Sequence, residues 1–242
     1  ESSSSAVNAS KNGFKAPENT ISAFSKALEQ GAEAIELDIH LTRDGELVVC
    51  HDHTINRTSN GKGFICNYTL NEMRQYDFGS WFSSEYIGEQ IPTLEEVLQL
   101  LQGTTVTLNI EIKNGLVVYD GIEEKLLSLL NQYRFLDQAI VSSFDHQCLN
   151  RIHTMKNAIR TSYILSQNLV NVMGYFEYNQ LQPYSIQPNY YIVTQELISE
   201  AHERSIKVFP YTINDIKLGE KIQKLAVDGI ITDFPNFFRQ LV

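Results

Sequence analysis

Residues 33–53 read EAIELDIHLTRDGELVVCHDH, and the rest of the chain can be interpreted outward from this stretch. Its first half alternates between apolar and polar side chains with a period of two, which is typical of a β-strand. Arg43, Asp44 and Gly45 follow as a turn signal. Leu47 and the two valines after it favour a second strand. The stretch therefore predicts an antiparallel hairpin that ends at the letters CHDH.

Two acidic residues share one face of the first predicted strand. Glu36 and Asp38 are two positions apart, so their Cα atoms lie roughly 6.5 Å apart, which suits two oxygen ligands of one cation. If Leu41 pairs with Glu46 across the turn, the register sets Glu36 opposite His51. This arrangement predicts a metal site with an acid/base histidine beside it. The alternative is an ordinary solvated sheet face, on which alternating acidic residues are common.

Length and charge narrow the class of protein. The chain has 242 residues, of which 43% are hydrophobic. That length fits one large domain, and a single α/β barrel typically has about 250 residues. The net charge of −10 argues against a nucleic-acid or anionic-membrane surface. A bound cation would still allow a small phosphate ligand, because it reverses the local field.

The cysteines indicate the redox state of the cellular compartment, and the hydropathy indicates whether the protein is anchored in a membrane. Three widely spaced cysteines indicate neither a disulfide framework nor a zinc site, and they favour a reducing compartment. No apolar run approaches the ~18 residues of a membrane span, so no stable membrane anchor is expected. The expected location is the cytoplasm, although a cleaved signal peptide would leave no trace. Association into a homo-oligomer is left open.

The segments around the predicted hairpin divide the chain. Residues 1–13 are rich in serine and asparagine and are expected to form a flexible tail or a loop. Residues 14–242 are expected to form one barrel domain, whose first helix is capped by Asn19 or Thr20 and ends at Gly31. Residues 54–91 are irregular and rich in aromatic side chains. Two interpretations of them stay open: an insertion over the barrel mouth that acts as a lid, or a packed connection.

From Ile91 onward, strand and helix patterns alternate. A Thr-x-x-Glu capping box starts one helix at Thr93, and the alternation argues for an α/β fold with a parallel sheet. Seven barrel strands are expected, at 33–39, 105–113, 138–143, 160–165, 184–187, 206–211 and 228–233. A closed (β/α)8 TIM barrel needs eight. Because the residues before Pro17 are unsuited to a strand, the first strand is expected to be missing or replaced.

A third carboxylate lies on the strand expected at 105–113. Asn109, Glu111 and Lys113 share one face at its C-terminal end, where β/α barrels build their sites. Glu111 is a candidate ligand beside Glu36 and Asp38, and three carboxylates suit Ca²⁺ or Mg²⁺ rather than zinc. Lys113 could hold an anionic oxygen. The alternative is a surface pair of Glu111 and Lys113.

Several motifs resemble those of the glycerophosphodiester phosphodiesterases. In chain order they are PENT at 17–20, IELDIHLTRDGELVVCHD at 35–52, RTSNGKG at 57–63, IPTLEEVL at 91–98, NIEIK at 109–113 and DGIITDFP at 228–235. The resemblance covers nearly everything from Pro17 to Pro235. It implies a TIM barrel with one divalent cation, Ca²⁺ or Mg²⁺. It also implies hydrolysis of a small-molecule glycerophosphodiester to glycerol 3-phosphate and an alcohol, with no nucleic-acid partner.

The resemblance also implies roles for single residues. It identifies three metal ligands: Glu36, Asp38 and Glu111. His51 becomes one of two acid/base histidines and Lys113 a phosphate contact, while Tyr211 stands where the family often has a tryptophan against the glycerol. The segment 54–91 matches a small insertion over the mouth. Related barrels with a similar metal trio act on choline-bearing phospholipids such as sphingomyelin, but PENT and TDFP favour the water-soluble substrate.

The resemblance breaks near the N-terminus. The family opens with a strand ending in His-Arg-Gly, which carries the second acid/base histidine and a phosphate-binding arginine. This sequence has no such motif and reads Ala-Val-Asn-Ala-Ser at 6–10. Either the true N-terminus is missing, which the loss of a whole strand favours, or this is a diverged member. Without that motif, we expect activity far below the family norm. The alternative function is a catalytically impaired member that binds a divalent cation and a glycerophosphate-like ligand.

Overall fold

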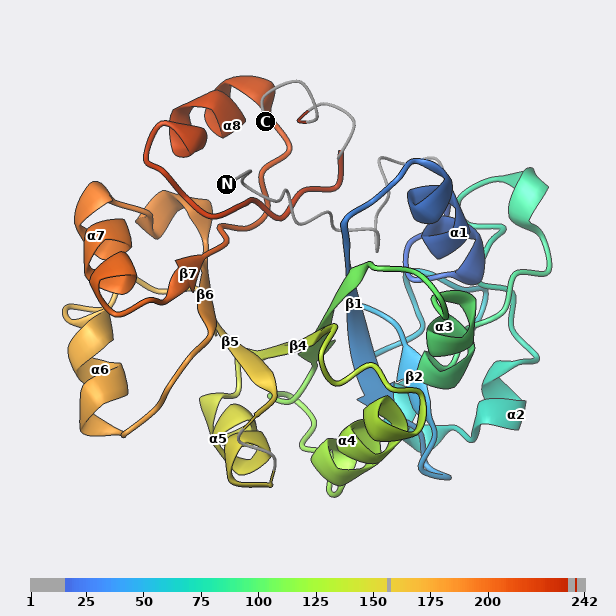
Figure 1. Cartoon of the computed structure of the whole chain (residues 1–242). Helices are drawn as coiled ribbons and strands as arrows, with labels where there is room; N and C mark the ends of the chain where they lie inside the picture. The colour runs from blue at the N-terminus through green and yellow to red at the C-terminus, as the bar shows by residue number, and fades with distance from the viewer. Residues whose placement is uncertain (1–15, 156–157, 235–237, 239–242) are drawn as a thin grey trace.

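A computed structural model of the chain describes residues 16–155, 158–234 and 238. Seven strands form one curved sheet, and the helices lie around its outer side (Figure 1). The strands are β1 (Ala34–Leu41), β2 (Leu47–Val49), β3 (Thr107–Ile112), β4 (Ala139–Ser143), β5 (Arg160–Leu165), β6 (Ser185–Pro188) and β7 (Lys207–Val208). The α-helices are α1 (Ile21–Glu29), α2 (Leu70–Met73), α3 (Leu94–Leu100), α4 (Ile122–Gln132), α5 (His146–Met155), α6 (Val172–Tyr178), α7 (Gln195–Glu203) and α8 (Ile216–Gln223). The predicted α/β architecture of the TIM-barrel type is confirmed.

The order of the strands brings their C-terminal ends to one edge of the sheet. That order is β2-β1-β3-β4-β5-β6-β7, and every neighbouring pair from β1 to β7 is parallel. Only β2 runs antiparallel, beside β1. Side chains at the ends of several strands therefore converge on one place, as in other parallel α/β sheets.

The hairpin forms, but its register differs by one residue from the prediction. Leu41 pairs with Leu47 instead of Glu46. Glu46 belongs to the turn, where its backbone N–H donates to the hydroxyl of Thr42 and its carbonyl accepts from the Thr42 backbone N–H. Gly45 completes the turn with a φ of +80°, a left-handed conformation that glycine adopts without a steric cost. The predicted position of Glu36 directly opposite His51 is therefore wrong.

The last predicted strand, at 228–233, is not a regular strand. Its backbone still pairs with the chain after β7, because Ile231 donates to the carbonyl of Pro210 and Ile213 donates to the carbonyl of Ile231. Pro210 lacks a backbone N–H, so a complete ladder cannot form at that point. The tail or loop predicted at 1–13, and the strand predicted to be missing there, lie outside the described residues.

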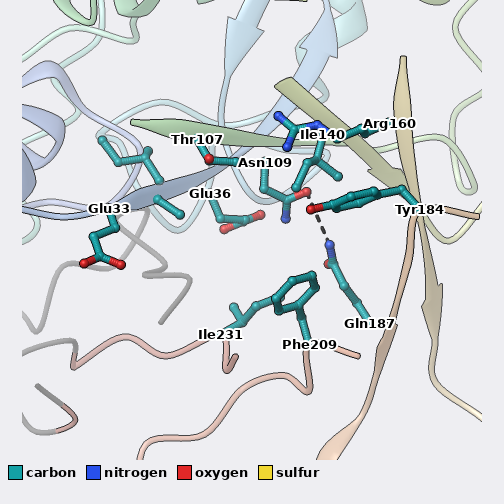
Figure 2. A pocket seen from close by; sticks show the side chains of 12 residues that line it. Glu33, Glu36, Thr107, Asn109, Ile140, Arg160, Tyr184, Gln187, Phe209 and Ile231 are labelled. Carbon is teal, nitrogen blue, oxygen red and sulfur yellow. Dashed lines mark hydrogen bonds between the residues drawn. The ribbon is translucent and has the colours of Figure 1, made fainter. Parts of the chain in front are cut away.

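The inside of the sheet is unusually polar for a barrel. Apolar side chains of the strands, such as Ile35, Leu37 and Ile110, belong to the large core cluster under the helices. The alternate positions face inward and include several polar groups. Gln187 of β6 donates to Asn109 of β3 across the interior (3.3 Å; Figure 2). These groups line a cavity of about 80 Å³ toward the N-terminal ends of the strands. Barrel interiors are usually filled by branched apolar residues, so this polarity favours a buried site.

The segment 54–91 packs with residues of the β2 region around a small hydrophobic core. Its cluster comprises Val48, Cys50, Ile55, Ile65, Met73, Phe78 and Ile91, separate from the main core. Glu89 accepts from the backbone and the hydroxyl of Ser22 in α1 (3.2 and 2.7 Å), and Tyr86 bonds to Lys26 of the same helix. The segment is therefore anchored beside α1. Its proposed action as a lid over the mouth stays a prediction.

The ends of two helices agree with the sequence. Thr20 caps α1 by accepting from the Ala23 backbone N–H, and Thr93 and Glu96 form the predicted capping box of α3. In the described part of the chain, no helix is both long enough and apolar enough to cross a membrane.

Candidate functional site

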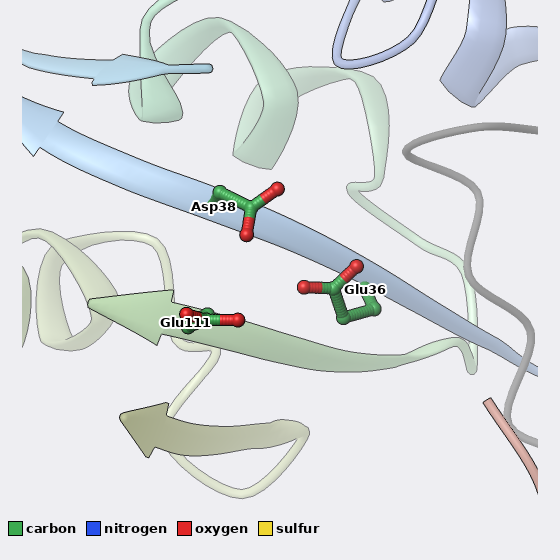
Figure 3. A group of neighbouring side chains, drawn as sticks. All are labelled: Glu36, Asp38 and Glu111. Carbon is green, nitrogen blue, oxygen red and sulfur yellow. The ribbon is translucent and has the colours of Figure 1, made fainter. Parts of the chain in front are cut away.

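Three carboxylates from two neighbouring strands converge inside the sheet. Glu36 and Asp38 come from β1 and Glu111 from β3, where Asp38 and Glu111 are direct register partners. One oxygen of each residue lies within 4.8 Å of the others, and all three residues are buried (Figure 3). The three predicted metal ligands are thus close enough to share one cation.

Lys113 brings a positive charge to two members of this trio. Its Nζ lies 2.9 Å from Asp38 Oδ1 and 2.7 Å from Glu111 Oε1. Burial alone would raise the pKa of Asp38, but Lys113 and the hydrogen bond from Asn19 outweigh burial and hold that pKa below its usual value. For Glu111, burial dominates and the pKa is raised. Burial would lower the pKa of Lys113, but the two carboxylates raise it, so the ammonium stays charged.

The donor set fits a hard divalent cation. Its donors are carboxylate oxygens, the ligands that Ca²⁺ and Mg²⁺ prefer. Asp38 and Glu111 share the Lys113 ammonium, so these two buried carboxylates carry more negative charge than that ammonium neutralises. Buried charges are costly unless they are paired or bind a metal. The buried trio therefore supports the predicted cation site, and its donor chemistry does not choose between Ca²⁺ and Mg²⁺.

Asn19 is a site residue that sequence reasoning missed. Its Nδ2 donates to Asp38 Oδ2 (2.9 Å), and both side chains are buried. Its backbone has a φ of +54°, a region in which asparagine is one of the few tolerated residues. Asn19 therefore fixes the rotation of a candidate metal ligand. It lies in the PENT motif, which was the available signal.

His51 follows β2 and lies at the same edge of the sheet. Its Nδ1 is 2.8 Å from Asp52 Oδ1. Arg57 donates to both oxygens of Asp52, and Glu18 accepts two further hydrogen bonds from Arg57. Sequence reasoning gave none of these three neighbours a role, although PENT, CHD and RTSNGKG contain them.

One cavity brings together the six residues to which the sequence assigned a role in the site. It has a volume of about 290 Å³ and opens at the C-terminal ends of the strands. Its lining includes all six: Glu36, Asp38, His51, Glu111, Lys113 and Tyr211. The arrangement therefore combines a cation site, a positive charge for an anion and an imidazole for proton transfer. The role of each residue stays a prediction.

Aromatic and apolar side chains form the other wall of this cavity. The rings of Tyr211 and Phe144 meet edge to face at 6.1 Å, and Ile164 lies in the same lining. Burial raises the pKa of Tyr211 to about 12, so its hydroxyl stays protonated at neutral pH. This wall suits the carbon skeleton of a small ligand. Phe144 and Gln187 were not predicted, because the sequence alone does not reveal which strand ends meet across the barrel.

A second histidine, His40, lies deeper beside the site. It is fully buried on β1, and its Nδ1 lies 2.9 Å from the hydroxyl of Tyr119. Its ring packs edge to face against His53, with centroids 5.1 Å apart. Burial, followed by the nearby charge of His53, lowers the pKa of His40 to about 3. The imidazole is therefore neutral at physiological pH.

Comparison with known proteins agrees with these observations. Residues 11–237 match the model of the glycerophosphoryl diester phosphodiesterase family. The chain is 41% identical over 226 residues to a glycerophosphodiester phosphodiesterase from Caldanaerobacter subterraneus subsp. tengcongensis, covering 93% of this chain and 92% of the relative. It is 38% identical to a glycerophosphodiester phosphodiesterase from Bacillus altitudinis, covering 93% of each chain.

A solved structure shares the fold as well. A phosphodiesterase from Oleispira antarctica, determined in complex with the product sn-glycerol-3-phosphate, superposes with a TM-score of 0.87 at 28% identity. The match covers 98% of this chain and 95% of that protein. With the family model matching most of the sequence, the chain belongs to the glycerophosphoryl diester phosphodiesterase family of enzymes.

Proposed function

We propose that the cavity hydrolyses glycerophosphodiesters to glycerol 3-phosphate and an alcohol in a reaction that depends on a divalent cation. The observation that carries the proposal is the shared cavity, in which the carboxylate trio, Lys113 and His51 meet. The product in the complex of the Oleispira antarctica phosphodiesterase, sn-glycerol-3-phosphate, supports the same substrate class.

The side chains of this chain divide the work. Glu36, Asp38 and Glu111 would hold the cation, either Ca²⁺ or Mg²⁺. Such an ion would neutralise the negative charge that develops on the phosphate oxygens during the reaction. Lys113 would bind a phosphate oxygen through its ammonium group, and its short contacts with Asp38 and Glu111 keep that group at the edge of the trio.

His51 moves the proton. Asp52 occupies the Nδ1 atom of His51 with a hydrogen bond, so Nε2 is the ring nitrogen available to the cavity that His51 lines. That nitrogen can take a proton from an attacking water or give one to the leaving alcohol. Tyr211 and Phe144 pack against the glycerol carbons and exclude water from one side of the phosphate.

The test is release of glycerol 3-phosphate from glycerophosphocholine with Ca²⁺, with Mg²⁺ and with EDTA. We expect turnover that EDTA abolishes. His51→Ala should lower kcat by about 10²- to 10⁴-fold, the usual contribution of general acid–base catalysis. Calorimetric binding of the cation should survive that substitution. His153→Ala on α5 is the matched control, because His153 is not part of the cavity lining.

Two results would argue against the proposal. Full turnover in EDTA would contradict the role of the cation. Cation-dependent binding of glycerol 3-phosphate without any turnover would instead identify the catalytically impaired ligand-binding protein that the sequence left as the alternative.

A further inference from the structure

A continuous chain of hydrogen bonds runs from the loop before α1 to His51. Glu18 accepts from Arg57 Nη1 and Nη2 (2.8 and 2.6 Å). Arg57 Nε and Nη2 donate to the two oxygens of Asp52 (2.9 and 3.0 Å). Asp52 Oδ1 lies 2.8 Å from His51 Nδ1. The guanidinium is thus held between two carboxylates by paired bonds on two of its edges.

The charges fix which atom of the imidazole carries hydrogen. Hydrogen bonds from Arg57 are the main reason that the pKa of Asp52 lies below its usual value, so Asp52 is ionised and can only accept. The contact with His51 is a hydrogen bond only if Nδ1 bears the hydrogen. A neutral His51 in this tautomer has a bare Nε2, which is the form that a general base needs.

The hydrogen bonds of Arg57 and Glu18 fix the orientation of the Asp52 carboxylate. A planar guanidinium bound at both ends cannot rotate without breaking two bonds at once. Glu18 anchors the far end, because its side chain is only 8% exposed. None of Glu18, Arg57 and Asp52 belongs to the described lining of the cavity.

We propose that Glu18, Arg57 and Asp52 are positioning residues that hold His51 as its Nδ1-protonated tautomer and aim Nε2 at the cavity. The proposal rests on the acid/base role of His51 proposed above. It assigns one loop, residues 17–20, to two tasks. Glu18 orients the histidine through Arg57, while its neighbour Asn19 orients the candidate metal ligand Asp38.

A purely structural role is the competing explanation. The Arg57 ion pairs could serve only to pin the loop before α1 to the segment 54–91. In that case, breaking them would change stability but not the state of the imidazole. The tautomer of His51 is therefore the property that separates the two explanations.

The experiment is nitrogen NMR of the full-length protein with ¹⁵N-labelled histidine. In the unsubstituted protein at a pH where His51 is neutral, we expect its Nδ1 to be protonated and Nε2 to be bare. Asp52→Ala removes the acceptor, so the Nδ1-protonated share should fall toward that of free imidazole side chains. Arg57→Met leaves Asp52 in place but free to turn, and it should produce a smaller shift in the same direction.

Matched variants keep the test interpretable. Glu18→Gln keeps the size of the Glu18 side chain and removes its charge. This variant replaces Asp52→Ala or Arg57→Met in the experiment if either of them does not fold. Arg43→Met is the control, because Arg43 donates from Nη2 to both carboxylate oxygens of Glu72 (3.0 and 2.8 Å), a pair that does not include His51. Arg43→Met should leave the His51 signals unchanged.

Kinetics provide the second readout. Asp52→Ala should lower kcat by about 10- to 100-fold, the range typical when a metal-ligating histidine loses its outer hydrogen-bond partner. KM should change less than about twofold, because Asp52 does not line the cavity.

An unchanged tautomer in Asp52→Ala would overturn the proposal, and so would a shifted tautomer with an unchanged kcat in an active enzyme. Failure of the proposed function is recognised separately. It would appear as full activity in His51→Ala or as no turnover at all, and the NMR result would still decide whether these residues position the imidazole.

Discussion

The ammonium nitrogen of Lys113 lies 2.9 Å from Asp38 Oδ1, between that carboxylate and Glu111. Lys113 and the proposed divalent cation would therefore compensate the same negative charges. Without a cation, Lys113 still offsets the repulsion between the buried carboxylates of Asp38 and Glu111.

Replacing Lys113 by methionine should destabilise the cation-free protein. Leaving a buried charge without its partner typically costs about 3 to 5 kcal/mol of unfolding free energy. The same change should tighten Ca²⁺ binding, because the competing ammonium is gone. Urea unfolding in EDTA measures the first effect, and isothermal titration calorimetry measures the second.

Lys125→Met is the control for this substitution. Lys125 forms a half-exposed pair with Glu46 (3.2 Å), and such pairs contribute less than about 1 kcal/mol. Equal losses of unfolding free energy in the two variants would mean that the contacts of Lys113 stabilise the fold no more than an exposed ion pair does.

Asp38→Asn should abolish the stabilisation of the fold by a cation. A ligand at one hundred times its dissociation constant stabilises a protein by about 2.7 kcal/mol, which EDTA should reverse. The variant loses one of three anionic ligands, so its melting temperature should no longer respond to Ca²⁺ or Mg²⁺. Glu72→Gln, on an exposed carboxylate, should retain the full response. A normal response in Asp38→Asn would exclude this carboxylate as a ligand.

His40 makes the stability sensitive to acid. Its pKa is about 3 in the folded chain against 6.5 for an ordinary histidine, because of burial and then His53. Between these values the unfolded chain binds one more proton, so stability falls as the pH drops from 6.5 toward 3. The contribution is at most about 1.4 kcal/mol per pH unit. Denaturant unfolding at several pH values should therefore show a shallower acid slope for His40→Gln. An identical slope would contradict the buried neutral state.

Tyr211→Ala should raise KM more than it lowers kcat. The ring forms part of the apolar wall with Phe144, and its hydroxyl donates to the backbone carbonyl of Leu165. Losing about 1.4 kcal/mol of contact corresponds to a tenfold rise in KM. Steady-state kinetics on glycerophosphocholine measures the effect. Tyr178→Ala on α6, where the side chain is 88% exposed, should have no effect. A loss confined to kcat would instead place Tyr211 in the chemical step.

Local patterns were sufficient to predict most strands and the carboxylate trio. The period of two around Glu36 and Asp38 identifies the inward face of β1, and the same reasoning applied to Glu111 on β3. These features depend on neighbours in sequence and on the shared edge of a parallel sheet. Six of the seven expected barrel strands are present within a few residues, although β7 is much shorter than predicted.

Features that depend on turn details or on distant contacts were not predictable in this way. The register of the hairpin depends on one backbone pair between Thr42 and Glu46. The segment at 228–233 is irregular because its neighbour Pro210 cannot donate. The hydrogen bonds that link Glu18 through Arg57 to Asp52 join residues more than thirty positions apart in the sequence. Only the folded chain shows that Phe144 and Tyr211 meet.

Strand β2 separates two cores that differ greatly in size. Leu47 and Val49 face the main core, while Val48 and Cys50 face the small cluster of the segment 54–91. A unit held by so few buried side chains can open locally while the barrel stays folded. Its amides should therefore exchange with solvent sooner than those of β3. Arg57 belongs to this unit, whereas the three carboxylates belong to the barrel. Local opening of this unit would thus release the proposed support of His51 and leave the proposed cation ligands in place.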